Sequence, residues 1–148
     1  MQLTLFTDYS LRALIYLAAR PDRLCTVKEI SQAYGISQNH MVKAMHRLTT
    51  LGYVEGRRGR GGGLALGMAP EEINIGEVVE QLEPDFHMAA CFDSTAPVCR
   101  IDGLCRLKGV LARALDGFKA ELHATTLADL VPNSAVLLAR FEAAAPKN

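Results

Sequence analysis

Residues 26–51 read TVKEISQAYGISQNHMVKAMHRLTTL and carry the pattern of two short amphipathic helices joined by one glycine. Thr26 precedes Glu29 by three residues, which is the spacing of a capping box at the start of a helix. Gly35 ends that helix, and the apolar residues of the next one, over residues 38–51, are expected to face inward: Met41, Val42, Met45, Leu48 and Leu51. Two helices around a tight glycine turn predict a helix-turn-helix.

A further helix and a β-hairpin flank this pair. Apolar residues recur at steps of three and four over residues 4–19, which predicts a helix with a stripe of Leu5, Tyr9, Ala13, Tyr16 and Leu17. After the helix-turn-helix, two short apolar segments surround the glycine-rich residues 56–63, as in a hairpin whose tip carries Arg57, Arg58 and Arg60. The expected fold is therefore mainly α with a small β-hairpin, namely a winged helix-turn-helix.

The chain divides into three regions. Residues 1–70 form the winged helix-turn-helix region, and residues 71–103 are expected to hold a connecting helix near 74–82 and a long loop without periodicity. Residues 104–148 begin with a long helix whose apolar residues step by three and four, namely Leu104, Leu107, Leu111, Ala114, Phe118 and Leu122. Because this is the spacing of a helix packed along another helix, we expect a dimerisation helix, then a short helix around 126–130 and a polar tail.

The formal net charge of zero hides a difference between the two halves of the 148 residues. Residues 1–70 contain nine Lys and Arg against four Asp and Glu, whereas residues 71–148 contain seven against twelve. A basic first half suits a polyanionic partner such as nucleic acid. The sequence shows neither an apolar run of about 18 residues nor a basic leader, so we expect no membrane span or secretory signal, and a cytoplasmic protein with reduced thiols.

The second helix of a helix-turn-helix lies in the major groove of DNA, and here that helix is residues 38–51. Asn and Gln can pair with adenine, and Lys or Arg can reach guanine or phosphate, so the candidate DNA-binding residues on it are Gln38, Asn39, His40, Lys43 and Arg47. Arg57, Arg58 and Arg60 at the hairpin tip suit a narrow minor groove. A protein-interaction module is the alternative, but shape and charge together favour double-stranded DNA.

Three cysteines, Cys91, Cys99 and Cys105, lie in or beside the long loop with the spacing C-x7-C-x5-C. Structural zinc usually takes close Cys pairs, whereas wider spacing suits the thiolate ligands of a bulky iron–sulfur cluster. From spacing alone a thiol redox switch, zinc or inert cysteines remain alternatives. Three thiolates leave one position open on a four-iron cluster. Cys25 lies far along the chain and is expected to be a small core residue.

The sequence resembles the family of winged-helix bacterial repressors that carry iron–sulfur clusters. The resemblance covers nearly the whole chain and rests on residues 3–12, on the glycine-rich wing over 57–66, and on the three-cysteine loop followed by a long helix. Family members that regulate cluster biogenesis use a His three residues after the third Cys, where this chain has Lys108. The nitric-oxide-sensing branch is therefore the better fit.

The resemblance implies a ligand set shared between two subunits. Cys91, Cys99 and Cys105 of one chain would hold a 4Fe-4S rather than a 2Fe-2S cluster, and Asp8 of the partner subunit would complete its coordination. Arg12 lies one turn beyond Asp8 on the same helix face, where it would offset the charge or hold the carboxylate. The alternatives are that Asp8 only complements the helix dipole and that Arg12 is its surface partner.

These observations predict a homodimeric, DNA-binding transcriptional repressor that senses nitric oxide and loses its operator when the cluster is nitrosylated. An iron- or redox-sensing regulator of the same fold is the main alternative. A small electron carrier is a further alternative, although such a carrier does not need a basic helix-turn-helix. An enzyme is least favoured, because the sequence shows no nucleophile elbow, phosphate loop or zinc-protease motif.

Overall fold

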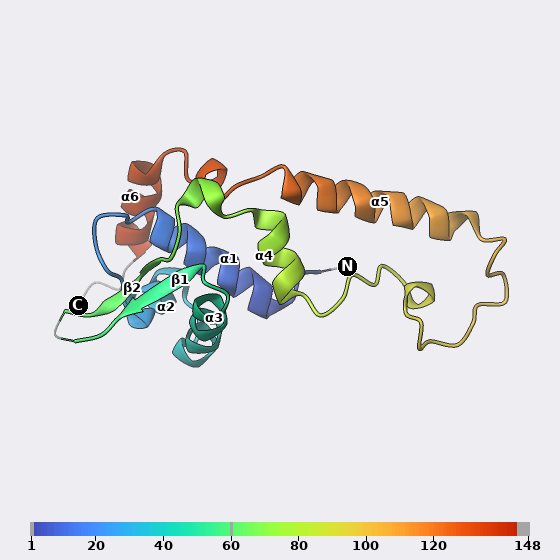
Figure 1. Ribbon diagram of the computed structural model, residues 1–148, viewed down its shortest axis with the longest axis horizontal. Helices are drawn as coiled ribbons and strands as arrows, with labels where there is room; N and C mark the ends of the chain where they lie inside the picture. Colours follow the sequence, from blue (N-terminus) through green and yellow to red (C-terminus); the bar gives the residue numbers. More distant parts are fainter. Residues whose placement is uncertain (1, 60, 145–148) are drawn as a thin grey trace.

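The computed structural model describes residues 2–59 and 61–144. It has a body and an arm: the loop after α4 runs outward from the body, and α5 runs back alongside it (Figure 1). The elements in chain order are α1 (Leu5–Ala18), α2 (Val27–Tyr34), α3 (Gln38–Thr50), β1 (Val54–Arg57), β2 (Gly63–Leu66), η1 (Pro70–Glu72), α4 (Ile75–Leu82), η2 (Ala90–Phe92), α5 (Arg106–His123), η3 (Ala128–Leu130) and α6 (Ser134–Ala144). In the described part of the chain, every helix is too short or too polar to span a bilayer.

The helix-turn-helix forms as its local signals predict. The Glu29 N–H donates to Thr26 Oγ1 at 3.2 Å, and the Thr26 N–H donates to Glu29 Oε2 at 2.7 Å, which confirms the capping box at the start of α2. Gly35 ends α2 with a φ of 64°, a left-handed conformation that glycine adopts without steric cost. The tight turn that it forms leads directly into α3.

One apolar core joins the three helices. Met41, Ala44, Met45 and Leu48 form the buried face of α3, and they share a core with Leu14 and Leu17 of α1 and with Ile30 of α2. Two expectations were wrong here. Val42 is 48% exposed, because it lies on the side of α3 turned away from this core, and Leu5 is 60% exposed, because it lies in the first turn of α1, ahead of the buried stretch.

The predicted hairpin is confirmed, and a residue between α1 and α2 anchors it. β1 and β2 are antiparallel, with Val54 opposite Leu66 and Arg57 opposite Gly63. The backbone of Cys25 exchanges two hydrogen bonds with that of Leu64, of 2.9 and 2.7 Å. Cys25 is fully buried, which confirms the prediction that it is a small core residue.

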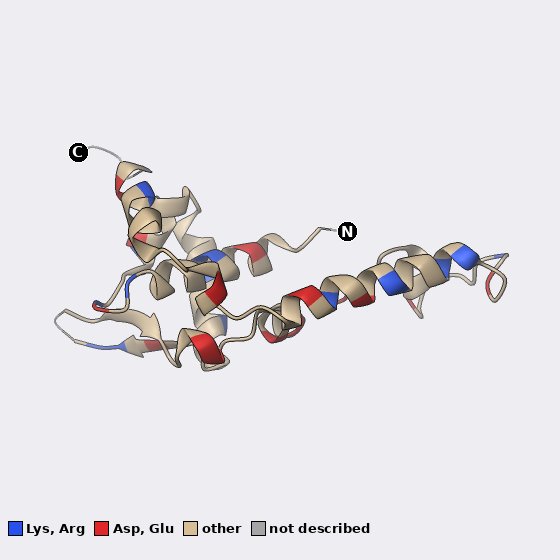
Figure 2. Cartoon of the chain, turned by 90° about the horizontal axis from the view of Figure 1, so that it is seen from above, with Lys and Arg blue, Asp and Glu red and all other residues tan. Residues whose placement is uncertain are grey.

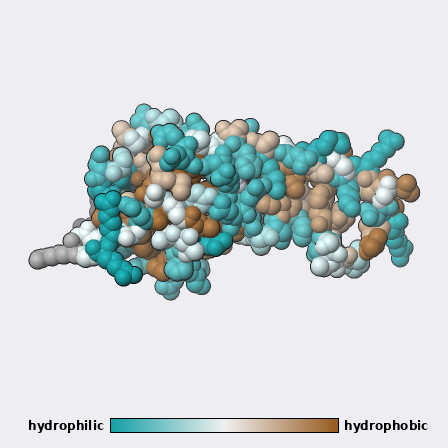
Figure 3. All heavy atoms as spheres, viewed as in Figure 1, coloured by the Kyte–Doolittle hydropathy of each residue, from teal (hydrophilic) through white to brown (hydrophobic). Residues whose placement is uncertain are grey.

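The arm is attached to the body where α4 packs on α5. The Ile75 N–H donates to the Thr125 carbonyl at 3.0 Å. Glu80 of α4 forms an ion pair with Lys119 of α5, and its Oε2 lies 3.3 Å from Nε2 of His123. Every residue of α5 is at least partly exposed in this single chain, including Leu107 at 63%. Brown patches along the arm show the same apolar surface (Figure 3). The dimerisation role of α5 stays a prediction.

The polar tail predicted beyond residue 130 was wrong, because the structure places α6 there. Phe141 packs on the rings of Tyr16 and Tyr34, with centroids 5.0 and 5.2 Å away, and Arg20 lies 4.0 Å over the Tyr16 ring. Burial raises the pKa of Tyr34 to about 12. Tertiary contacts with α1 and α2, rather than a strong amphipathic pattern, therefore stabilise this short helix.

Candidate nucleic-acid interface and cysteine loop

The polar side of α3 is turned to solvent. Opposite its buried face, α3 exposes all the predicted DNA-binding residues of this helix: Gln38, Asn39, His40, Lys43 and Arg47. Figure 1 shows α3 at the lower side of the body and the hairpin extending beside it, with α6 at the opposite side. Tyr53, at the start of the hairpin, donates its N–H to the Leu48 carbonyl at 3.0 Å. The wing is therefore tied to the end of α3.

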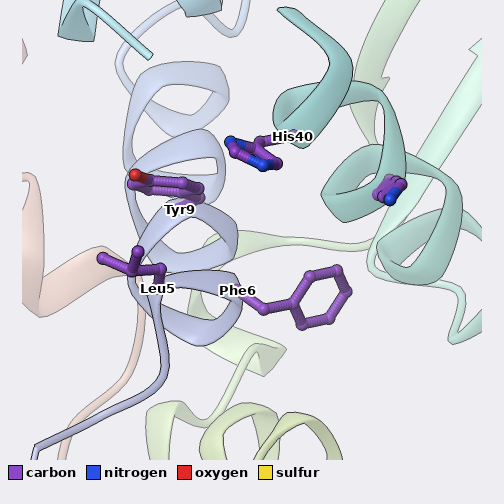
Figure 4. Close-up of a pocket in the computed structure, with 5 residues that line it drawn as sticks. Leu5, Phe6, Tyr9 and His40 are labelled. Carbon is purple, nitrogen blue, oxygen red and sulfur yellow. The ribbon is translucent and has the colours of Figure 1, made fainter. Parts of the chain in front are cut away.

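Two of the predicted DNA-binding residues also contact neighbouring helices. The His40 ring lies 6.0 Å from the ring of Tyr9, at an interplanar angle of 31°. Figure 4 shows both rings beside a hollow of about 230 Å³ between α1 and α3, which Leu5, Phe6 and Lys43 also line. Arg47 Nη2 donates to the Gln81 carbonyl near the end of α4 at 3.3 Å. α3 thus contacts both α1 and α4.

The wing also carries an ion pair next to its tip. Glu55 Oε1 accepts from Arg57 Nη2 at 2.7 Å and from Arg57 Nε at 3.0 Å, so an acidic side chain pairs with the first wing arginine. Arg58 is exposed. Arg60 lies outside the described residues. Figure 2 shows the acidic and basic segments side by side on β1.

The three loop cysteines lie on the arm with their thiols free. Cys91 belongs to η2, Cys105 immediately precedes α5, and both are half-buried, whereas Cys99 is exposed. Cys91 and Cys99 line one hollow of about 180 Å³ together with Asp102 and Lys108. The structure therefore brings two of the three predicted ligands to the same hollow.

Lys108 adds a positive charge to this group of thiols. Its ammonium donates to Asp102 Oδ1 at 2.9 Å, and this hydrogen bond raises the pKa of Lys108, to which negative charge on Cys91 and Cys105 also contributes. Cysteine binds metals through its thiolate form. By contrast, burial raises the pKa of the Cys25 thiol, so Cys25 is a poor candidate ligand.

The three loop thiols are donors of the kind that iron–sulfur clusters and zinc both take. Within residues 2–59 and 61–144, no three His, Cys, Asp or Glu side chains lie close enough together to hold one metal ion. Each thiolate of a four-iron cluster binds a different iron, so such a cofactor needs thiols spread around a larger space.

Asp8 and Arg12 form the expected pair on α1. Arg12 Nε donates to Asp8 Oδ1 at 2.9 Å, and the side chains are 35% exposed for Asp8 and 43% for Arg12. Asp8 belongs to the body, whereas the three cysteines belong to the arm (Figure 1). Coordination by Asp8 across a dimer stays a prediction.

Sequence reasoning missed two polar contacts that position this site. Glu83, two residues before the loop, accepts from the Thr4 N–H at 2.8 Å and from Thr4 Oγ1 at 3.1 Å. A contact across 79 residues leaves no local signal. The Lys108–Asp102 pair gave a weak signal, since both residues are charged and close in sequence.

Comparisons with known proteins agree with this architecture. Residues 3–133 match the Rrf2 family, described as "Iron-dependent Transcriptional regulator". The chain is 54% identical over 134 residues to the HTH-type transcriptional regulator NsrR of Bacillus subtilis (strain 168), covering 90% of this chain and 92% of that one. It is 48% identical to NsrR of Halalkalibacterium halodurans, over 90% of this chain and 92% of that protein.

A solved structure shows the same fold. It is that of CymR, the global cysteine regulator of B. subtilis, with a TM-score of 0.72, 26% identity, and coverage of 89% of this chain and 97% of that one. These relatives are transcriptional regulators and not enzymes, as the sequence predicts. They also argue against the electron-carrier alternative. The chain is a winged helix-turn-helix transcriptional regulator and belongs to the Rrf2 family.

Proposed function

We propose that this protein is a homodimeric, cytoplasmic transcriptional repressor that binds an operator in double-stranded DNA and releases it in response to nitric oxide. The observation that carries the proposal is the group of three free cysteines on an arm attached to a winged helix-turn-helix. The identity of 54% to a regulator named NsrR supports the same branch of the family.

The body would read DNA with α3 and the wing. Gln38 and Asn39 at the start of α3 suit adenine, and Lys43 reaches guanine or phosphate. His40 and Arg47 flank these residues, where they also hold α3 against its neighbours. Arg57, Arg58 and Arg60 of the wing would enter the minor groove, whose negative potential favours arginine.

The arm would hold an iron–sulfur cluster, 4Fe-4S rather than 2Fe-2S, through Cys91, Cys99 and Cys105. Asp8 of the partner subunit would complete the coordination. When bound, the cluster supplies iron atoms that react with nitric oxide. Lys108 offsets the charge of the thiolates, and Arg12 holds the Asp8 carboxylate in place on α1.

The chain's own contacts connect the cysteine loop to the DNA-reading helix. Glu83 precedes the loop and holds the start of α1 through Thr4, while the Gln81 carbonyl accepts from Arg47 of α3. A displacement of the loop that moves the end of α4 therefore shifts both α1 and α3. Two copies joined along α5 would present two α3 helices to half-sites about one helical turn apart, or a multiple of that distance.

The test begins with protein purified without oxygen. We expect visible absorbance, with iron and sulfide present in each chain, and operator binding that nitric oxide weakens more than a chelator or oxygen does. Colourless, iron-free protein that binds its operator with full strength would contradict the cluster. A coloured protein whose binding ignores nitric oxide would contradict only the signal.

Mixed dimers test the shared ligand set. One chain carries Asp8→Ala and the other Cys99→Ala, so a single complete site exists only if the carboxylate comes from the opposite chain. We expect the mixed dimer to keep one cluster per two chains that reacts with nitric oxide as the wild-type cluster does. If Asp8 serves its own chain, neither site of the mixed dimer has a full set of ligands. The two homodimeric variants are the controls.

An iron-sensing regulator is the second candidate, because the family is described as iron-dependent. A redox signal acting on the same cysteines belongs to this candidate too. Comparing the three treatments separates these signals. Nitric oxide should release the operator from a nitric oxide sensor, a chelator from an iron sensor, and oxygen from a redox sensor.

A further inference from the structure

Val42 is an exposed apolar residue on the DNA-facing helix. Its side chain is 48% exposed, whereas the adjacent Met41 is fully buried. Val42 lies three residues after Asn39 and four before His46, so the three side chains share one side of α3. An apolar side chain therefore interrupts the polar surface that α3 presents.

The fold of the single chain gives Val42 no packing role. In the described part of the chain, it belongs neither to the buried core nor to the partly buried residues packed against that core. A single exposed valine needs no explanation on an ordinary surface. Val42 is, however, the fifth residue of α3, in the half of the helix from which a helix-turn-helix contacts base edges.

The major groove offers one apolar group that such a residue can recognise. Thymine displays its C5-methyl group there, while the other exposed base edges are hydrogen-bond donors and acceptors. Valine forms no side-chain hydrogen bonds, so a methyl contact is the only direct means by which it distinguishes one base from another. Asn39 and Lys43 beside it supply hydrogen bonds to the neighbouring bases.

We infer that Val42 is a specificity-determining residue that packs against the methyl group of a thymine in each operator half-site. The inference rests on the proposed function, in which α3 lies in the major groove. It predicts that Val42 and one thymine methyl contribute as a pair, so that removing either group removes the same contact. Burying one methyl group contributes about 0.8 kcal/mol, which is about a fourfold change in Kd.

The experiment replaces single thymines with deoxyuridine, which lacks only the methyl group. Full-length protein purified without oxygen is first used to select an operator from random duplexes, and Kd is then measured for each substituted duplex. For the wild type we expect one thymine per half-site at which deoxyuridine raises Kd by about fourfold. For Val42→Ala we expect a similar loss on the intact operator and no further loss with that deoxyuridine.

Two other variants make the result specific. Val136→Ala removes a valine of α6 that is 58% exposed, and we expect it to keep the wild-type response to every deoxyuridine. Val42→Thr keeps one methyl group, so it should retain part of the response. Circular dichroism checks that each variant has the wild-type helix content.

The outcomes separate the inference from the function on which it rests. A wild-type protein that prefers its selected operator over a scrambled duplex, yet is indifferent to every deoxyuridine, overturns the inference alone. A deoxyuridine effect that persists unchanged in Val42→Ala does the same. Equal binding to selected and scrambled duplexes overturns the operator-binding function, and the inference with it.

Discussion

Glu83, the residue directly after α4, caps the first helix of the body by accepting a 2.8 Å hydrogen bond from the backbone N–H of Thr4. Thr4 Oγ1 in turn accepts from the Thr7 N–H at 3.2 Å, so the start of α1 has both a local and a distant cap. Because Glu83 lies just before the cysteine loop, this contact connects the loop to α1, the helix that carries Asp8 and Arg12.

Replacing Glu83 should loosen that connection. Glu83→Ala removes a charged acceptor beside a helix N-terminus, and we expect it to lower the free energy of unfolding by about 1–2 kcal/mol, measured by urea denaturation. Glu83→Gln should cost less, because its amide oxygen still accepts. Glu71→Gln, at an exposed acidic residue of η1, is the control. Equal stability of all three variants would show that the cap does not stabilise the fold.

The junction of α4 and α5 depends on a glycine. A Cβ atom at Gly76 would lie 2.5 Å from Cγ of the His123 ring, so Gly76→Ala forces that ring to move. We expect a loss of about 1–3 kcal/mol in the free energy of unfolding. His123→Ala removes the obstructing ring, so the double variant should lose less than the sum of the two single variants. If the losses in the free energy of unfolding are additive, the added Cβ atom does not clash with the His123 ring.

The ion pair of the wing should limit DNA binding. Glu55 holds Arg57 and also places a negative charge close to the phosphates, so Glu55→Gln should tighten operator binding. Arg58→Ala should weaken it by about 1–3 kcal/mol if Arg58 enters a groove. Both are measured as Kd against salt concentration. A salt dependence that neither change alters would show that the wing stays off the DNA.

Removal of one loop thiol should remove the cofactor. Cys99→Ala is expected to abolish the visible absorbance of protein purified without oxygen, because a cluster ligand is lost. Cys25→Ala is the matched control, since Cys25 is buried in the body and its thiol has a raised pKa. Iron and sulfide are counted in both variants. Full colour in Cys99→Ala would exclude Cys99 from the ligand set.

The body was predictable from the sequence because its signals are local. The capping box of Thr26 and Glu29 and the turn at Gly35 are decided within a few residues. Val42 and α6 were not predictable in this way. Periodicity could not tell which edge of α3 the core covers, and α6 depends on aromatic contacts between Phe141 and residues far along the chain.

The candidate site was predictable in its donors but not in their surroundings. The spacing of the three cysteines identified the thiols, and the structure adds that two of them share a hollow with Lys108. The link between Glu83 and Thr4 spans 79 residues, so only the folded chain reveals it. Asp8 lies on a different part of the molecule from the thiols, and a single chain does not test how two copies meet.

The family match ends at residue 133, and α6 begins at residue 134. A version trimmed to the matched length would uncover the rings of Tyr16 and Tyr34 and leave the Arg20 guanidinium without Phe141 above it. Such a shortened chain would expose an aromatic surface on the side of the body away from α3. The body therefore extends beyond the matched residues, because α6 covers the aromatic rings of α1 and α2.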